Sequence, residues 1–278
     1  MANSITEAFG LDTGIIADIG IQSASRIYKA FRKQKKRAEF YRKSECFMKY
    51  RIKFSKYSSM VFIGHLDMMR YFQKAIRRAG LPVAYSTGFS PHQILSFAAP
   101  LGVGLFSNGE YADLEFTTEV KTAECKKRLQ AVMVEGVDIL SVKVLPKDAG
   151  NAMASVAAAS YTIKIRKGHE REGFSFTKEF DCFMSQDEIL IEKETKKSSK
   201  VLNLKEFIFD YKADADSIYL LVDASSSGNI KPGLVMDAYY QFLHMEPEAF
   251  EFVITREETY TRDHNGQLIS LDAVGEDL

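Results

Sequence analysis

Cationic residues recur at helical spacing between His65 and Gly80, and a basic stripe of this kind can follow the phosphates of a nucleic acid. The stripe comprises Arg70, Lys74, Arg77 and Arg78, with Asp67 three residues before the first of them. Steps of three and four residues bring most of these side chains to one side of an α-helix. The same pattern also describes the solvent-facing side of an ordinary amphipathic helix, in which Asp67 pairs with Arg70.

Three more cations alternate with apolar residues shortly before this helix. The alternating run is Lys49, Tyr50, Arg51, Ile52, Lys53 and Phe54. A period of two is typical of a half-buried strand, so the cations share the face opposite the apolar residues. If that face is open, they extend the basic surface. If a neighbouring strand lies beside them, they pair with Asp113 and Glu115 instead.

Two glycine-containing segments, YSTGFSPHQ and PLGVG, carry residue types suited to single-stranded RNA. Glycine lets the backbone approach a ligand closely, and an aromatic ring can stack on a base. The predicted contact residues are Ser86, Phe89, Gly102 and Gly104. The second segment lies in a loop of about ten residues between two strands, and an ordered loop of that length is typical of a functional loop. The structural alternative is a turn set by proline, with Phe89 buried.

Two histidines are candidates for catalysis. His65 stands at the start of the basic helix and His92 in the first glycine segment, and a pair of imidazoles can act as acid and base in RNA cleavage. The alternative is that each has a structural role. No CxxC or HExxH motif is present, so the sequence predicts no metal site.

A third segment, ASSSGNIKPG, precedes a predicted helix. Ser227, Gly228 and Lys231 there, with the amide groups of the helix start, have the composition of a phosphate cradle. The segment lacks the spacing of a Walker loop, which argues against nucleotide hydrolysis. A serine-rich turn with Pro232 in the first helical turn is the alternative.

The elements that position these residues follow from periodicity. After the strand that begins at Met48, an apolar stripe predicts a helix that ends at Gly80. The stripe comprises Leu66, Met69, Phe72, Ile76 and Ala79. Strands are then predicted at Gln93–Ala98 and Glu110–Thr117, a helix at Thr122–Val134 and a strand at Val137–Leu145. This βαββαβ order is that of a ferredoxin-like unit.

The same order recurs in the second half of the chain. Strand patterns begin at Tyr161 and recur in DEILIEKE, SIYLLVDA and AFEFVITRE, and helices are predicted at SFTKEFDCFM and LVMDAYYQFLH. Val201–Tyr211 is predicted to be an insertion between the central strands. We therefore predict an α+β protein with two tandem ferredoxin-like domains, 48–146 and 160–258, joined by a linker at 147–159. A basic, helical extension at 1–47 and an acidic tail at 259–278 flank them.

Composition limits the remaining possibilities. The 278 residues suit two domains, and 37 basic against 37 acidic residues make local charge clusters more informative than net charge. Neither a membrane-spanning run nor a signal peptide is evident, which predicts a cytoplasmic protein without membrane contact. Cys46, Cys125 and Cys182 are far apart, as expected for reduced, isolated thiols.

The run from Phe54 to Phe116 resembles the signature of the radical-SAM-linked proteins, a domain of unknown function found beside or fused to radical SAM enzymes. The elements HLD, RRAGLP, YS.GF.PH and PL.VG carry the resemblance, and LNLKEFI with SSSGNIKP fits its second half. It extends over about residues 48 to 255. Gly64 departs from it, because the family usually has a serine there, and residues 1–47 have no counterpart.

This resemblance implies an accessory protein that works with a radical SAM partner among RNA and ribosome functions. It emphasises His65, Asp67, Arg70, Arg77, Arg78, Ser86, Phe89 and His92. The iron-sulfur cluster and S-adenosylmethionine are expected on the partner only, because this chain lacks a cysteine triad for a cluster. No cofactor is expected on the chain itself.

The element order is also similar to that of RAMP-type CRISPR repeat endoribonucleases, in fold only. We therefore expect an RNA-binding accessory protein that presents ribosomal or transfer RNA to a radical SAM modification enzyme and that has no catalytic activity of its own. Two alternatives stay open. The first is a metal-independent endoribonuclease, and the second is a protein-only adaptor of the radical SAM subunit.

Overall fold

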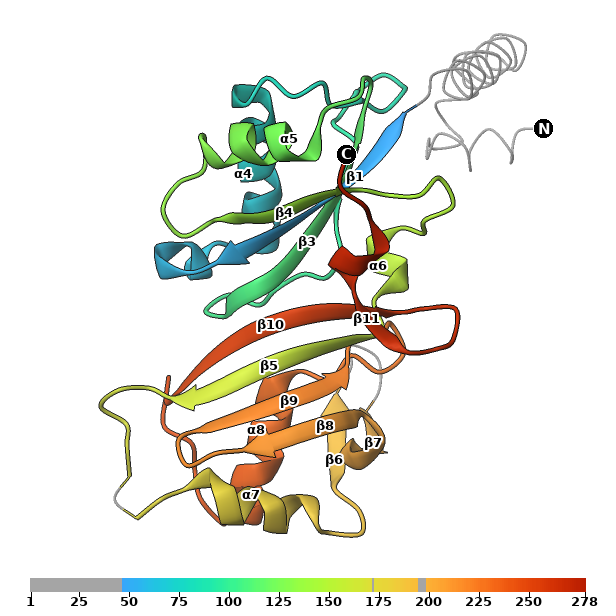
Figure 1. Cartoon of the computed structure of the whole chain (residues 1–278). Helices are drawn as coiled ribbons and strands as arrows, with labels where there is room; N and C mark the ends of the chain where they lie inside the picture. The colour runs from blue at the N-terminus through green and yellow to red at the C-terminus, as the bar shows by residue number, and fades with distance from the viewer. Residues whose placement is uncertain (1–46, 172, 195–198) are drawn as a thin grey trace, which may run out of the picture. The chain divides into compact units, whose positions relative to one another are not determined.

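The computed structural model describes residues 47–171, 173–194 and 199–278, whose course Figure 1 shows. The described part is a mixed α+β structure with one large mixed sheet and five α-helices. Ala84–Ile94 belongs to one compact unit, and Met48–Val83 with Leu95–Leu278 form another, so each is described by itself. The extension predicted at 1–47 lies outside the described residues, except for Phe47.

A nine-stranded sheet runs in the order β4-β1-β3-β10-β5-β9-β8, with β2 paired to β3 and β11 to β10. Its first half contains β1 (Met48–Lys56), β2 (Leu95–Phe97), β3 (Phe106–Phe116) and β4 (Ile139–Val144). Its second half contains β5 (Ala158–Ile165), β8 (Ile208–Ala213), β9 (Ser217–Asp223), β10 (Phe252–Arg262) and β11 (Leu268–Ser270). The halves meet where β10 runs parallel to β3, with Thr255 opposite Phe106 and Arg256 opposite Ser107.

Two helices cover one face of the first half (Figure 1). The short η1 (Ser58–Phe62) leads into α4 (His65–Arg78), and α5 (Thr122–Gln130) precedes β4. Tyr50, Ile52 and Phe54 on β1 are buried against these helices, which confirms the predicted alternation. Burying each such side chain contributes roughly 1.5–3 kcal/mol, so this layer accounts for much of the stability of the half.

The buried side of α4 differs from the predicted stripe. Met68, Phe72, Ala75 and Ile76 are buried, whereas Leu66 is 66% exposed. At about 100° per residue, Leu66 lies about 120° around the helix from Phe72, while Met68 lies only about 40° from it. The prediction that Leu66 faces the core was therefore wrong, and Leu66 belongs to the outer side of α4.

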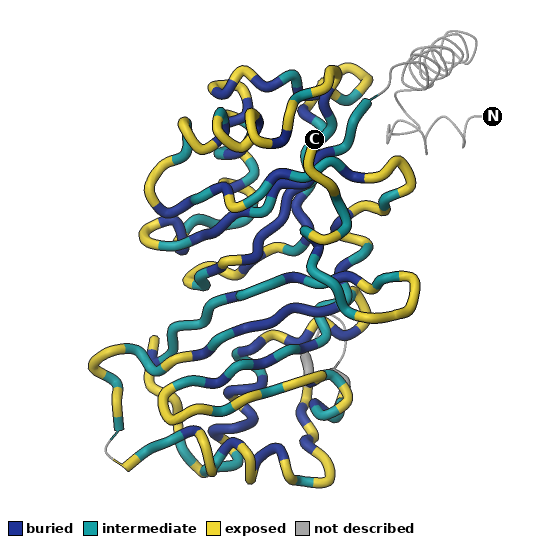
Figure 2. Tube along the Cα trace, in the orientation of Figure 1, coloured by how far each residue is buried: buried dark blue, intermediate teal, exposed yellow. Residues whose placement is uncertain are grey.

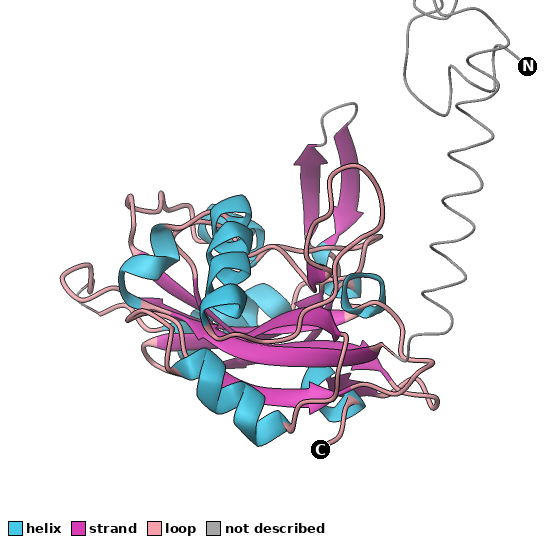
Figure 3. Ribbon diagram, turned by 90° about the horizontal axis from the view of Figure 1, so that it is seen from above, coloured by secondary structure: helices cyan, strands magenta, loops and turns pink. Residues whose placement is uncertain are grey.

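In the second half, α7 (Phe176–Met184) and α8 (Pro232–Phe242) pack on the sheet. Val201–Tyr211, which the sequence predicted to be an insertion, contains parts of two strands and a short helical turn. β6 (Leu190–Glu194) and β7 (Ser199–Asn203) form a separate hairpin, which stands off the main sheet in Figure 3 and leads into η2 (Leu204–Glu206).

The strand beside β9 is β8, not the strand predicted at residues 187–194, and β8 begins inside the predicted insertion and ends two residues after it. The short turn 214–216 connects β8 to β9, and Asp214 N donates to the Ser217 carbonyl oxygen at 2.8 Å. This tight connection favours β8 over the more distant β6 as the partner of β9.

The predicted linker and the predicted acidic tail both fold onto the sheet. The linker contains α6 (Ala152–Ser155), and the tail extends β10 past residue 258 and adds β11 and η3 (Leu271–Val274). Ala152 and Leu271 are fully buried with Tyr111 in a small core, and Figure 2 shows the buried positions that follow the strands. Tyr111 alternates with the β3 residues that face α4, so this core covers the opposite face of the first half.

Candidate nucleic-acid interface

The outer side of α4 carries the predicted cations at the surface. Arg70, Lys74, Arg77 and Arg78 are all exposed. Arg70 Nη1 lies 3.0 Å from Asp67 Oδ1, but both side chains are more than half exposed, so the pair is weak and easily opened. Among the described residues, Lys74 and Arg77 form no ion pair. The exposed stripe therefore keeps most of its charge available.

The neighbouring helix adds to this charge. α4 contains four cations against one acid, and α5 contains three, Lys126, Lys127 and Arg128, against Glu124. Two of them also support the fold: Lys126 Nζ donates to the Leu140 carbonyl oxygen at 2.7 Å, and Arg128 bonds the end of α4. The helices of the second half differ, because α7 has one cation against two acids and α8 has one acid and no cation. Only the helix layer of the first half is cationic within the described residues.

The cations of β1 do not extend this surface. The Arg51 side chain is 1% exposed, and its Nε and Nη2 donate to Asp113 Oδ1 and Oδ2 at 2.7 and 2.9 Å. Its Nη1 donates to the Leu271 carbonyl oxygen at 3.1 Å. The cross-strand interpretation is confirmed for Arg51, and its predicted role as an RNA contact is not supported. The cause is the folded linker and tail, which close the face that an open sheet would expose.

Lys53 and Lys49 also make contacts within the fold. Lys53 Nζ lies 2.6 Å from Glu258 Oε2 on β10, with both side chains mostly buried. Lys49 stands opposite Glu115 in the strand register, and its Nζ donates to the Ala149 carbonyl oxygen at 3.3 Å. These contacts fasten the sheet to the linker and to β10, and they leave the outer side of α4 as the main cationic surface.

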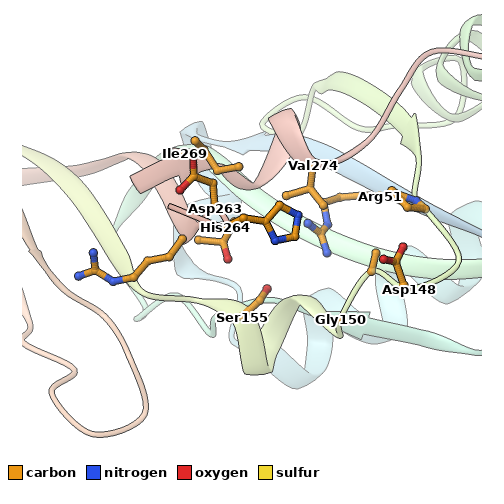
Figure 4. A pocket seen from close by; sticks show the side chains of 12 residues that line it. Arg51, Asp148, Gly150, Ser155, Asp263, His264, Ile269 and Val274 are labelled. Carbon is orange, nitrogen blue, oxygen red and sulfur yellow. The ribbon is translucent and has the colours of Figure 1, made fainter. Parts of the chain in front are cut away.

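A pocket of about 400 Å³ lies beside Arg51 (Figure 4). It is enclosed by residues 146–155 of the linker and 261–274 of the C-terminal hairpin, and the His264 side chain projects into it. Arg262 Nη1 on its wall donates to the Gly266 carbonyl oxygen at 2.8 Å, and Asp263 Oδ1 accepts from two backbone amides of the turn. No sequence motif marks this pocket, because it forms only where two distant segments meet.

The segment Ala84–Ile94 is a closed loop. Ser86 Oγ lies 2.8 Å from His92 Nδ1 and accepts from the His92 amide at 3.0 Å, while Ser86 N donates to the His92 carbonyl oxygen at 2.7 Å. Gly88 has a φ of 136°, which favours glycine, and Phe89 is 87% exposed. His92 and Ser86 thus close this loop, which suits a structural role for His92, and the alternative of a buried Phe89 was wrong.

The second glycine segment and His65 pack near one another. Gly104 has a φ of 86°, and its amide donates to the Val61 carbonyl oxygen at 2.8 Å. A Cβ on Gly102 would lie 2.6 Å from Leu105 Cδ1, so Gly102 serves local packing. The His65 ring stands edge-on to Phe97, with ring centroids 5.5 Å apart. This contact gives His65 a packing role at the start of α4.

Sequence reasoning missed a group of buried charges. Lys56, Glu110 and Arg256 are each less than a tenth exposed, and Arg256 Nη1 lies 2.8 Å from Glu110 Oε1. Lys56 Nζ donates to the Ile63 carbonyl oxygen at 2.8 Å. Burial lowers the pKa of the Lys56 ammonium, an effect that Glu110 opposes and Arg256 reinforces. The sequence did carry a signal for the burial of Lys56, because Lys56 follows Tyr50, Ile52 and Phe54 at the same two-residue spacing.

The serine-rich turn donates hydrogen bonds to a carboxylate of the chain itself, that of Asp223. Asp223 Oδ1 accepts from the amide and the hydroxyl of Ser225, at 2.7 and 2.6 Å, and Ser225 Oγ lies 3.0 Å from Ser227 Oγ. A Cβ on Gly228 would collide with the Asp223 carboxylate at 2.4 Å. That carboxylate takes hydrogen bonds of the turn and would repel a phosphate, so the contacts favour the turn over the cradle predicted at Ser227, Gly228 and Lys231.

The described residues include few candidates for metal binding or thiol chemistry. In the part of the chain that the structure describes, no group of three or more histidine, cysteine, aspartate or glutamate side chains is arranged to hold a metal ion. The two described cysteines, Cys125 and Cys182, are free, and burial raises the pKa of the Cys125 thiol to about 12. No described helix has the length and apolar character needed to cross a bilayer.

Comparison with known proteins places the chain in a family. Residues 49–232 match the family described as "Uncharacterized protein conserved in bacteria (DUF2344)". The match covers more than half of the 278 residues, and the chain belongs to this family. It includes β1, α4, α5 and the serine-rich turn, and it ends at the first residue of α8. A search of curated proteins gives no match.

Proposed function

We propose that this protein is an RNA-binding accessory protein and that the outer side of α4 contacts RNA phosphates. The observation that carries the proposal is the concentration of exposed cations on α4, beside the cationic α5, in a chain with no net charge. A polyanion gains most from such a local surface, because each neutralised phosphate releases bound counterions. The contacts proposed are Arg70, Lys74, Arg77 and Arg78.

We further propose that each half of the sheet is a ferredoxin-like unit. In the second half the order β10-β5-β9-β8 corresponds to strands 4-1-3-2 of a βαββαβ unit, with the β6–β7 hairpin as the insertion. In the first half β4-β1-β3 with β2 follows the same order, and the short β2 leaves part of β3 for β10. This arrangement supports the similarity to RAMP-type proteins in fold.

The proposed partner is a radical SAM protein, to which this chain presents ribosomal or transfer RNA. The support is the resemblance of residues 54–116 to the radical-SAM-linked signature, and cofactor chemistry is assigned to the partner. Among the described residues, His65 packs on Phe97 and His92 bonds Ser86, contacts that support structural roles for both histidines. We therefore rank binding above cleavage.

The test is a double charge reversal, Lys74→Glu with Arg77→Glu, compared with Lys164→Glu and Lys178→Glu at exposed positions of the second half. We expect the α4 variant to lose at least tenfold in affinity for total tRNA or ribosomal RNA at about 0.1 M salt, by fluorescence anisotropy. The slope of log affinity against log salt should fall by about 1.4 if two single-strand phosphate contacts are lost.

Equal losses of RNA affinity in both double variants would show that α4 is not part of the interface. The same samples, incubated with RNA and EDTA, test the rival. Discrete cleavage products that disappear in His65→Ala or His92→Ala would favour the endoribonuclease. Wild-type protein that binds no RNA at all, yet copurifies with a radical SAM protein, would favour the adaptor.

A further inference from the structure

Three large apolar side chains are exposed on segments that meet at the start of α4. Phe62 is 70% exposed, Leu66 66% and Val103 63%. Phe62 ends η1 and Leu66 is the second residue of α4, while the hydrogen bond from Gly104 N to the Val61 carbonyl oxygen holds the 102–104 loop beside η1. We call Phe62, Leu66 and Val103 the apolar patch.

The apolar patch is continuous with the cationic stripe. Leu66 precedes Arg70 by four residues and Lys74 by eight, and Arg77 follows eleven residues after it. At about 100° per residue these four side chains fall within an arc of about 80°. The outer side of α4 thus begins with the apolar Leu66 and continues with cations.

A hollow near the start of α4 is too small for a ligand group to enter. It measures about 20 Å³, its lining includes Ile63, His65, Leu101 and the buried Lys56 and Glu110, and no residue of the apolar patch lines it. That volume suits one water molecule at most. A nucleobase at the apolar patch would therefore lie on its exposed side chains and not enter this hollow.

We infer that the apolar patch stacks an unpaired nucleobase and that this protein consequently prefers single-stranded RNA to duplex RNA; this rests on the proposed function. Aromatic side chains that stack bases beside a basic groove are the usual means of holding single strands. A duplex hides its base faces and offers α4 only phosphates and riboses. The cations that continue from Leu66 favour RNA over an apolar protein segment as the occupant.

The experiment compares one fluorescent 12-nucleotide RNA with the same strand annealed to its complement. Wild type should bind the single strand more tightly. Phe62→Ala with Leu66→Ala should weaken single-strand binding about tenfold, within the range for loss of one stacked base, and leave duplex binding unchanged. Phe62→Trp with Leu66 intact should retain single-strand binding, because it keeps a stacking ring.

A matched control replaces two equally exposed apolar residues of the β6–β7 hairpin, Leu190→Ala and Val201→Ala, which should bind like wild type. Urea unfolding shows that each variant folds. Equal affinity of wild type for both RNAs, with no effect of the patch variant, overturns the inference and leaves the proposed function standing. Absence of binding to either RNA overturns the proposed function itself. A patch variant that keeps its RNA affinity but loses a copurifying protein assigns the patch to protein docking.

Discussion

Among individual residues, Glu110 is the carboxylate of a buried ionic group that links β3 to β10. Glu110 Oε1 accepts from Arg256 Nη1 and from Ser107 Oγ, both at 2.8 Å, so one carboxylate compensates a buried guanidinium and fixes a hydroxyl. Lys56 is a second buried cation in the same group. Charges taken out of water are tolerated only while their partners remain.

Glu110→Gln should therefore lower the free energy of unfolding by about 3 kcal/mol, because it leaves Arg256 and Lys56 without a carboxylate. Lys56→Met removes one of two cations and keeps the methylene packing, and we expect it to cost less than about 1.5 kcal/mol. Urea denaturation at neutral pH measures both. Similar losses in the two variants would mean that Glu110 does not compensate the cations.

At the scale of elements, the C-terminal end of α4 determines where the cationic stripe stops. Gly80 has a φ of 62°, Gly80 N donates to the Arg77 carbonyl oxygen at 3.0 Å, and Leu81 N donates to that of Ile76 at 3.3 Å. This is the glycine stop that the sequence predicted. Arg128 on α5 adds Nε and Nη2 bonds to the Ala79 carbonyl oxygen at 2.9 and 2.7 Å, and it also bonds that of Gly80.

Arg128→Ala should destabilise the protein by about 1–2 kcal/mol, since it removes charged donors from the carbonyl end of a helix. Lys127→Ala, at the adjacent exposed position, should change stability by less than about 0.5 kcal/mol. Thermal and urea unfolding would measure the difference. If Lys127→Ala were as costly as Arg128→Ala, the bonds to α4 would not be the cause.

At the scale of the whole sheet, the two halves are joined over a short parallel seam that depends on one close approach. A Cβ on Gly109 of β3 would lie 2.6 Å from the Glu258 Cα and 2.7 Å from the Glu257 carbonyl oxygen. Both are backbone atoms, which cannot move away as the end of a flexible side chain can. Thr259 Oγ1 also donates to the Gly109 carbonyl oxygen at 2.9 Å, so β10 and β3 are held in contact there.

Gly109→Ala should cost about 1–3 kcal/mol, because the added methyl group forces β3 and β10 apart. Gly150→Ala is the matched control, since a Cβ there would meet nothing within 4 Å, and we expect a neutral effect. Unfolding followed by both circular dichroism and tyrosine fluorescence would measure the loss. A neutral Gly109→Ala would show that the seam can relax without penalty.

Local patterns in the sequence were enough to predict β1 and the end of α4. Alternation fixed β1 and the burial of Tyr50, Ile52 and Phe54, and a glycine after a periodic run fixed the end of α4. These features depend on side-chain period and backbone preference, which act within a few residues. The exposed cations of α4 were predictable for the same reason, because helical spacing alone puts them on one side.

Which charges are available depended on packing between segments that are distant in the sequence. Arg51 and Lys53 have the same alternating pattern as solvent-facing cations, but segments about 60 to 220 residues away, at Asp113, Glu258 and Leu271, pair with them. The choice of β8 over β6 in the sheet, and the exposure of Phe62 beside Leu66, depended in the same way on packing between distant segments. Periodicity says which side of an element a residue faces, and only the packing of other elements says whether that side meets water.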